Sequence, residues 1–144
     1  MADKLWILVG NASRMRLFAA DERGDDWQLR EELRHDESRA HEGDLKEQRD
    51  NPNAGTLHGP NQETEPNARQ ELERDRFARE LATRLERGVD GHAFERLIIA
   101  APPTFLGRLR KAMSKKVLQR LVLDLDADYS NVPARELPNR VPVI

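Results

Sequence analysis

Two segments of the chain are apolar at successive positions, with no polar face. Residues 5–9 read LWILV, and residues 94–101 end in LIIAA. A strand that is apolar on both of its alternating faces is covered on both sides of its sheet. A Gly-Asn and a Pro-Pro dipeptide follow these segments and end them with turn chemistry. The pattern therefore predicts two central strands.

Three further segments are short strands by the same criterion. Residues 15–20 are largely apolar, and strict alternation over residues 123–128 predicts a last, half-exposed strand. Apolar and polar side chains also alternate over residues 27–33, which predicts an edge strand. The apolar side chains that this alternation places on one face are Trp27, Leu29 and Leu33.

Helical spacing appears in the second half of the chain. The apolar residues of one helical face are Phe77, Ala78, Leu81 and Leu85. Gly88 predicts the C-terminal stop of this helix. Acidic residues four positions before basic ones predict two supporting ion pairs, Asp75 with Arg79 and Glu80 with Arg84.

Two shorter helices are expected after the Pro-Pro dipeptide. The first carries its apolar residues at helical spacing, at Phe105, Leu109, Ala112 and Met113. Ser114 is a plausible cap for the second. The apolar residues of this second helix are Val117, Leu118 and Leu121.

These elements occur in the order βββαβαβ, and their burial decides the sheet. The two apolar strands belong in the middle, and the alternating third and fifth strands belong at the edges. Right-handed crossovers then give the strand order 3-2-1-4-5, with strand 4 parallel to strand 1. We therefore expect an α/β fold, a single domain over residues 1–144 with a mixed sheet of five strands and flanking helices.

Apolar periodicity is absent from about residue 36 to residue 66. A structureless stretch of this length in a compact domain is usually functional or disordered. We expect a long polar loop that could be mobile, with room for a short helix over residues 42–49. The loop side chains that could act on a partner or substrate are His41, Gln48, Arg49 and His58.

Composition narrows the function. Charged residues make up 35% of the 144 residues and hydrophobic ones 38%, mean hydropathy is −0.81, and the formal net charge is −2. This balance excludes the whole-protein basic field of a general nucleic-acid binder and leaves only a local basic patch for that role. The absence of cysteine excludes disulfides, thiolate nucleophiles and cysteine-bound metals. The apolar run at residues 5–9 is too short for a signal or a membrane span, so we expect a cytoplasmic protein without membrane contact.

The loops that follow strands 1 and 4 leave the same edge of the sheet and form a crevice at the switch point. Its predicted polar side chains are Asn11, Ser13, Arg14, Thr104 and Arg108. An arginine fork and the backbone N–H groups of a helix start are suited to an anion. The alternative is a plain turn followed by a helix cap, because the glycine-rich phosphate fingerprint is absent.

Residues 108–120 contain six basic residues and no acidic one. Besides Arg108, these residues are Arg110, Lys111, Lys115, Lys116 and Arg120. They could contact RNA or ribosomal phosphate. The alternative is a solvated outer helix face, since no aromatic residue interleaves to stack bases.

Two other groups of residues could bind a metal ion, but their patterns favour a structural or solvated role. Asp124, Asp126 and Asp128 could hold a divalent cation, but charges on an edge strand also discourage unwanted strand pairing. The four histidines, among them His35 and His92, lack metal-ligand spacing and are expected to be solvated loop residues. We therefore expect neither a metal nor another cofactor.

Three segments together resemble the bacterial host attachment protein family. They are residues 6–18, which include WILV and NASRMRLF, residues 76–81 (RFAREL) and residues 101–110 (APPTFLGRLR). That family is similar to the middle domain of archaeal and eukaryotic class I peptide-chain release factors. The resemblance implies a ribonuclease-H-like fold and a role near the ribosome. Release factors carry a Gly-Gly-Gln tip, which this chain lacks, so peptidyl-tRNA hydrolysis does not carry over.

Three functions remain open on the sequence. The leading one is binding of RNA or the ribosome through the basic helices and the long loop, without established catalysis. The second is an anion-binding protein or hydrolase that uses the crevice. The third is an adaptor that contacts another protein through the long loop. The sequence leaves the oligomeric state open.

Overall fold

The computed structural model of the protein describes residues 4–35 and 65–142. Its elements are the strands β1 (Leu5–Gly10), β2 (Arg14–Ala20) and β3 (Gln28–Arg34), the helix α3 (Glu65–Asp90), the strand β4 (Arg96–Ala101), the helices α4 (Pro103–Ala112) and α5 (Lys115–Leu118), the strand β5 (Leu121–Asp126), the 3-10 turn η1 (Ala134–Glu136) and the helix α6 (Leu137–Arg140). The short helix predicted over residues 42–49 lies outside the described residues.

The strands form one five-stranded sheet in the order β3-β2-β1-β4-β5. β2 pairs antiparallel with β1 and β3, whereas β4 pairs parallel with β1 and β5. The predicted α/β class, the mixed sheet and the strand order are confirmed. β1 and β4 lie at the centre because their apolar residues leave neither face suited to water, and every residue of β1 is buried.

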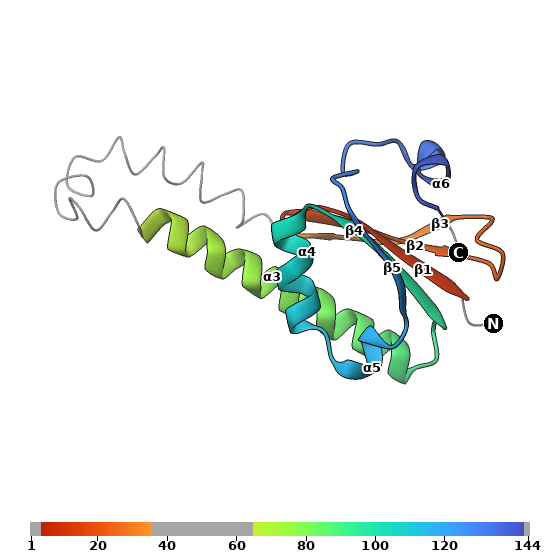
Figure 1. The fold of residues 1–144 in the computed structure, drawn as a ribbon, viewed down its shortest axis with the longest axis horizontal. Helices are drawn as coiled ribbons and strands as arrows, with labels where there is room; N and C mark the ends of the chain where they lie inside the picture. Colours follow the sequence, from red (N-terminus) through yellow and green to blue (C-terminus); the bar gives the residue numbers. More distant parts are fainter. Residues whose placement is uncertain (1–3, 36–64, 143–144) are drawn as a thin grey trace.

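The sheet separates two apolar cores. The helices α3, α4 and α5 lie on one side of it, and α6 lies on the other (Figure 1). On one face, Trp6 of β1 belongs to a cluster with Phe77 of α3, and α4 and α5 cover the same face. The next residue, Ile7, points to the other face and belongs to a cluster with Leu137 and Val141. The C-terminal segment, residues 127–142, thus covers the face that the helices α3, α4 and α5 leave open.

The predicted apolar stripe of α3 is confirmed. Its four residues are each at most 1% exposed, whereas Leu72, which is off the stripe, is 46% exposed. The helix begins at Glu65, so the last two residues of the predicted loop over residues 36–66 are helical. Pro66 takes the second position of the helix, where its missing N–H breaks no helical hydrogen bond.

Gly88 does not end α3, contrary to the prediction. The helix continues to Asp90, and the left-handed residue beyond its end is His92, with φ of 56°. A Cβ atom at Gly88 would lie 2.7 Å from Cζ3 of Trp6 and 2.8 Å from Cε1 of Phe94. Glycine is needed here because two aromatic rings press against the helix backbone.

The two ion pairs predicted within α3 are wrong. Asp75 pairs instead with Arg108 of α4, with 2.7 Å between Oδ1 and Nη1. Arg84 pairs with Glu31 of β3, with 3.1 Å between Nε and Oε2. The long side chains of α3 therefore tie the helix to its neighbours instead of supporting it from within.

The single apolar face predicted for β3 is also wrong. The pairing register shifts between Leu17 and Phe18 of β2, which leaves Arg30 as an extra residue in β3. Such a bulge reverses the faces on which the side chains before and after it lie. Trp27 accordingly packs on the side of the C-terminal segment, whereas Leu33 packs on the side of α3.

The boundaries around α5 differ from the predicted ones. Leu121 is the first residue of β5 and not part of the helix, and Asp128 lies beyond the end of that strand. Ser114 precedes α5 as expected, but its hydroxyl makes no capping hydrogen bond. The carbonyl oxygen of Ser114 accepts from the backbone N–H groups of Val117 and Leu118, and the side chain of Val117 is fully buried.

Candidate functional site

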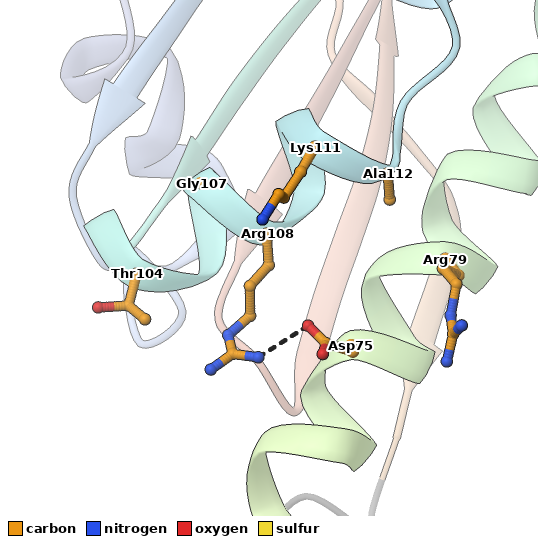
Figure 2. Close-up of a pocket in the computed structure, with 7 residues that line it drawn as sticks. All are labelled: Asp75, Arg79, Thr104, Gly107, Arg108, Lys111 and Ala112. Carbon is orange, nitrogen blue, oxygen red and sulfur yellow. Dashed lines mark hydrogen bonds and ion pairs between the residues drawn. The ribbon is translucent and has the colours of Figure 1, made fainter.

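A groove of about 660 Å³ lies between α3 and α4 (Figure 2). Its lining residues are Asp75, Arg79, Thr104, Gly107, Arg108, Lys111 and Ala112. Three of these side chains are cationic and one is anionic, so the lining carries a net charge of about +2 at neutral pH. The packing of Phe77 and Phe105, whose ring centroids lie 5.7 Å apart, sets the two helices side by side beneath this groove.

Arg108 spans the groove and joins the two helices. Its Nη1 donates to Oδ1 of Asp75 at 2.7 Å and to the carbonyl oxygen of Glu71 at 3.1 Å. The carboxylate of Glu71 lies 4.0 Å from Nη2. Because acidic groups already surround this guanidinium, Arg108 holds α4 against α3 more than it offers charge to a ligand.

Arg79 and Lys111 supply the uncompensated charge of the groove. Neither makes an ion pair within the described part of the chain. Arg79 also borders a second pocket of about 420 Å³ on the other side of α3, where Arg84 and Arg87 lie. Because Arg84 pairs with Glu31 and Glu80 also lines this pocket, Arg87 is the residue that extends the positive charge beyond Arg79, and it makes no ion pair with a described residue.

Two of the other predicted basic residues are neutralised by acidic partners. Arg110 pairs with Asp124 of β5. The Nζ atom of Lys116 donates to Oδ1 of Asp90 at 2.7 Å, and this hydrogen bond raises the pKa of the Lys116 ammonium group.

The remaining residues of the predicted basic set lie near α5. Lys115 is exposed and Arg120 is half-buried just before β5. Neither forms an ion pair with a described residue. Lys111 is the one member of this five-residue set that lines the groove.

The residues of the predicted crevice divide between two places. Thr104 and Arg108 line the groove, but Asn11, Ser13 and Arg14 do not. Oδ1 of Asn11 accepts hydrogen bonds from the backbone N–H groups of Ser13 at 2.9 Å and Arg14 at 3.0 Å. Asn11 thereby closes the turn between β1 and β2. The groove does not bring all five residues together. Anion binding by the whole set stays a prediction.

The three aspartates do not form a carboxylate cluster. Asp124 is engaged with Arg110, and Oδ1 of Asp128 accepts from the backbone N–H of Ser130 at 2.9 Å and from its hydroxyl at 2.5 Å. Within residues 4–35 and 65–142, no group of three or more acidic or histidine side chains is arranged to hold a metal ion.

His35 is not a solvated loop residue, contrary to the prediction. It is 8% exposed, its Nε2 lies 2.8 Å from Oε2 of Glu73, and its ring stacks on Phe77. This contact fixes the end of β3 on α3. His92 is exposed, as expected. The four predicted loop residues, His41, Gln48, Arg49 and His58, lie outside the described residues.

Arg79 and Asp75 are groove residues that the sequence pattern does not identify. The sequence spacing predicts that they pair with each other, and only the packing of α3 on α4 places both residues at the same groove. The signal in the sequence is that Arg79 lies on the outward side of the apolar stripe of its helix.

No described helix has the length and apolar content needed to cross a membrane.

The groove lies inside a region that matches a known protein family. The family described as "Protein required for attachment to host cells" matches residues 6–141, which include every described strand except the first residue of β1. No curated protein matches the chain. The extent of the family match shows that the chain belongs to the family of proteins required for attachment to host cells.

Proposed function

We propose that this member of the family binds RNA through the groove between α3 and α4. The observation that carries the proposal is that Arg79 and Lys111, which line the groove from opposite sides, have no acidic partner among the described residues. A cation without a protein partner can neutralise a backbone phosphate and release its counterions. The groove offers at least two such cations within one surface.

Local placement of the charge reconciles this function with an acidic chain. The formal net charge is −2, so the whole protein does not attract a polyanion. Arg87 extends the positive face of α3 beyond Arg79, which suits an extended backbone better than a single small anion. We expect binding with little base selectivity, because backbone contacts carry no sequence information.

The similarity to release-factor middle domains is part of the same proposal. The strand order and the position of the long helix are compatible with that arrangement. Ribosomal RNA is the form of RNA that such a domain would meet, which requires a cytoplasmic location. We propose binding without peptidyl-tRNA hydrolysis, because the chain contains no Gly-Gly-Gln tip. A contribution to host attachment would then be indirect, through an RNA-bound state of the protein.

The proposal is tested by fluorescence anisotropy with a labelled single-stranded RNA over a series of salt concentrations. The variant carries Arg79→Gln and Lys111→Gln together. We expect its affinity to fall by about tenfold and the slope of log affinity against log salt to become shallower by about 1.5. Ribosome co-sedimentation of the same two proteins extends the test to the proposed physiological partner.

The matched control removes two positive charges from the opposite side of the sheet. Arg135 of η1 and Arg140 of α6 are exposed. The helix α6 lies on the side of the sheet opposite α3 (Figure 1). The Arg135→Gln, Arg140→Gln protein should bind RNA as the unmodified protein does. Equal weakening in both double variants would show an effect of net charge alone and would refute a site in the groove.

A further inference from the structure

We infer that Arg14, Arg16 and Arg34 form a binding site for a phosphate dianion on the sheet face opposite the α3–α4 groove. The strand register brings them together, because Arg14 of β2 lies directly across from Arg34 of β3, and Arg16 lies across from Glu32. Side chains two residues apart on a strand share a face. All four charged side chains therefore emerge on the face that carries the C-terminal segment.

The site has more positive charge than its own carboxylate can balance. Oε1 of Glu32 accepts a hydrogen bond from Nε of Arg34 at 2.7 Å and lies 3.2 Å from Nε of Arg14. One carboxylate thus faces three guanidinium groups, which leaves a net charge of about +2. Like charges directly opposite on neighbouring strands repel each other, so Arg14 and Arg34 favour an additional anion between them.

The terminal nitrogen atoms of two of these arginines remain available. Arg34 uses only Nε in a hydrogen bond to the described part of the chain, and neither terminal nitrogen of Arg14 donates one there. The side chains of Arg34 and Arg14 are 59% and 36% exposed, so a ligand can reach them from solvent. Paired N–H groups of a guanidinium match the oxygen spacing of a phosphate.

Arg16 holds the buried side of the site in place. It is 7% exposed, and its Nη2 donates to the carbonyl oxygens of Tyr129 at 2.9 Å and Val132 at 2.8 Å. A cation fixed by these bonds contributes charge without losing further freedom when a ligand binds.

The charges of the arginines contribute to two pKa shifts in this cluster, after a hydrogen bond in one case and burial in the other. The hydrogen bond from Arg34, followed by the charges of Arg14 and Arg34, lowers the pKa of the Glu32 carboxyl group. Burial, followed by the charge of Arg14, lowers the pKa of the Arg16 guanidinium.

A doubly charged phosphate is the ligand class that the charge balance fits. A phosphate group carries close to two negative charges at neutral pH, which matches the excess of the cluster. Inorganic phosphate and the phosphate group of a monoester share this chemistry. None of the four residues lines the groove between α3 and α4, so the inference does not rest on RNA binding.

The test is isothermal titration of the full chain with inorganic phosphate, and separately with phosphoserine, at constant ionic strength. Arg14→Gln and Arg34→Gln should each weaken phosphate binding by about tenfold, the effect of losing one charge-assisted contact. Glu32→Gln should tighten binding, because it removes the competing carboxylate and keeps the side-chain shape. Tighter binding of phosphoserine than of inorganic phosphate would assign the site to a monoester, and the reverse order to the free anion.

The matched control is Arg23→Gln, since Arg23 lies in the turn between β2 and β3, beyond the opposite ends of these strands. Circular dichroism establishes that each variant is folded. If Arg14→Gln does not fold, Arg34→Gln still tests the inference, because Arg34 is the more exposed residue. The inference is overturned by an absence of saturable binding at millimolar phosphate. It is equally overturned if Arg23→Gln weakens binding as much as Arg34→Gln does, or if Glu32→Gln weakens it.

Discussion

At the scale of single residues, two glycines in helices have opposite surroundings. Gly88 of α3 lies against the rings of Trp6 and Phe94, which stack on each other with centroids 4.5 Å apart. Gly107 of α4 has no neighbouring atom within 4 Å of the position that a Cβ atom would take. The same substitution therefore meets a steric cost in one helix and none in the other.

Gly88→Ala should destabilise the protein by about 1–3 kcal/mol, because overpacking two rigid rings outweighs a helix-propensity gain of about 1 kcal/mol. Gly107→Ala, the matched control, should stabilise it by about 0.5–1 kcal/mol. Urea unfolding of both variants measures the difference. A Gly88→Ala protein as stable as the control would contradict the close packing of α3 on the sheet.

Glu32 gives the stability of the protein a dependence on pH. Its pKa is lowered from 4.5 in the folded state, so the ionised carboxylate stabilises the fold above its unfolded-state pKa. That contribution is lost as the pH falls through the folded-state pKa. Glu32→Gln should therefore be less stable than the unmodified protein at neutral pH, with the difference shrinking below about pH 4. Urea unfolding at a series of pH values measures the stability difference between the two proteins. A difference that does not change between neutral and acidic pH would argue against this role of Glu32.

At the scale of elements, the C-terminal segment is held on the sheet by both apolar and polar contacts. Leu137 and Val141 are at most 1% exposed and complete the core on that face. Arg16 reaches from β2 to the carbonyl oxygens of Tyr129 and Val132. The segment thus acts as a covering layer, although η1 and the single turn of α6 are the only regular structure between residues 127 and 142.

Arg16→Met should lower the free energy of unfolding by about 2–3 kcal/mol, because hydrogen bonds from a charged donor are lost and buried carbonyl groups remain. Methionine keeps most of the apolar volume, which separates the polar contribution from packing. Arg135→Met, an exposed control on η1, should change stability by less than about 0.5 kcal/mol. If chemical unfolding shows the same small effect for both variants, the hydrogen bonds of Arg16 do not stabilise the C-terminal segment on the sheet.

Hydrophobic pattern was sufficient to predict the sheet, because burial on two faces distinguishes the central strands β1 and β4 from the edges. The bulge at Arg30 could not be foreseen, since one extra residue leaves the alternating pattern of β3 intact while reversing its faces. The ion-pair partners of Asp75 and Arg84 could not be predicted either. Both pair with residues on other elements, and helical spacing describes only neighbours on the same helix.

The same reasoning explains how much of the candidate groove was predictable. Lys111 and Arg108 were found because they belong to a run without acids. Arg110 and Lys116 belong to the same run but are neutralised by Asp124 and Asp90. Charge along the chain identifies candidates, but only tertiary packing decides which of them keep an uncompensated charge.

At the scale of the whole molecule, the sheet divides the surface into two charged regions with different layers around them. The groove between α3 and α4 belongs to the helical side, and the cluster around Glu32 belongs to the side of the C-terminal segment. The two regions can therefore be changed independently. RNA binding and phosphate binding should respond to separate sets of variants.

The most direct measurement is ultraviolet cross-linking of the protein to bound RNA, followed by mass spectrometry of the cross-linked peptides. The account predicts cross-links on peptides of α3 and α4 that line the groove, and their loss in the Arg79→Gln, Lys111→Gln protein. Cross-links confined to η1 and α6, or none at all, would contradict RNA binding in the groove.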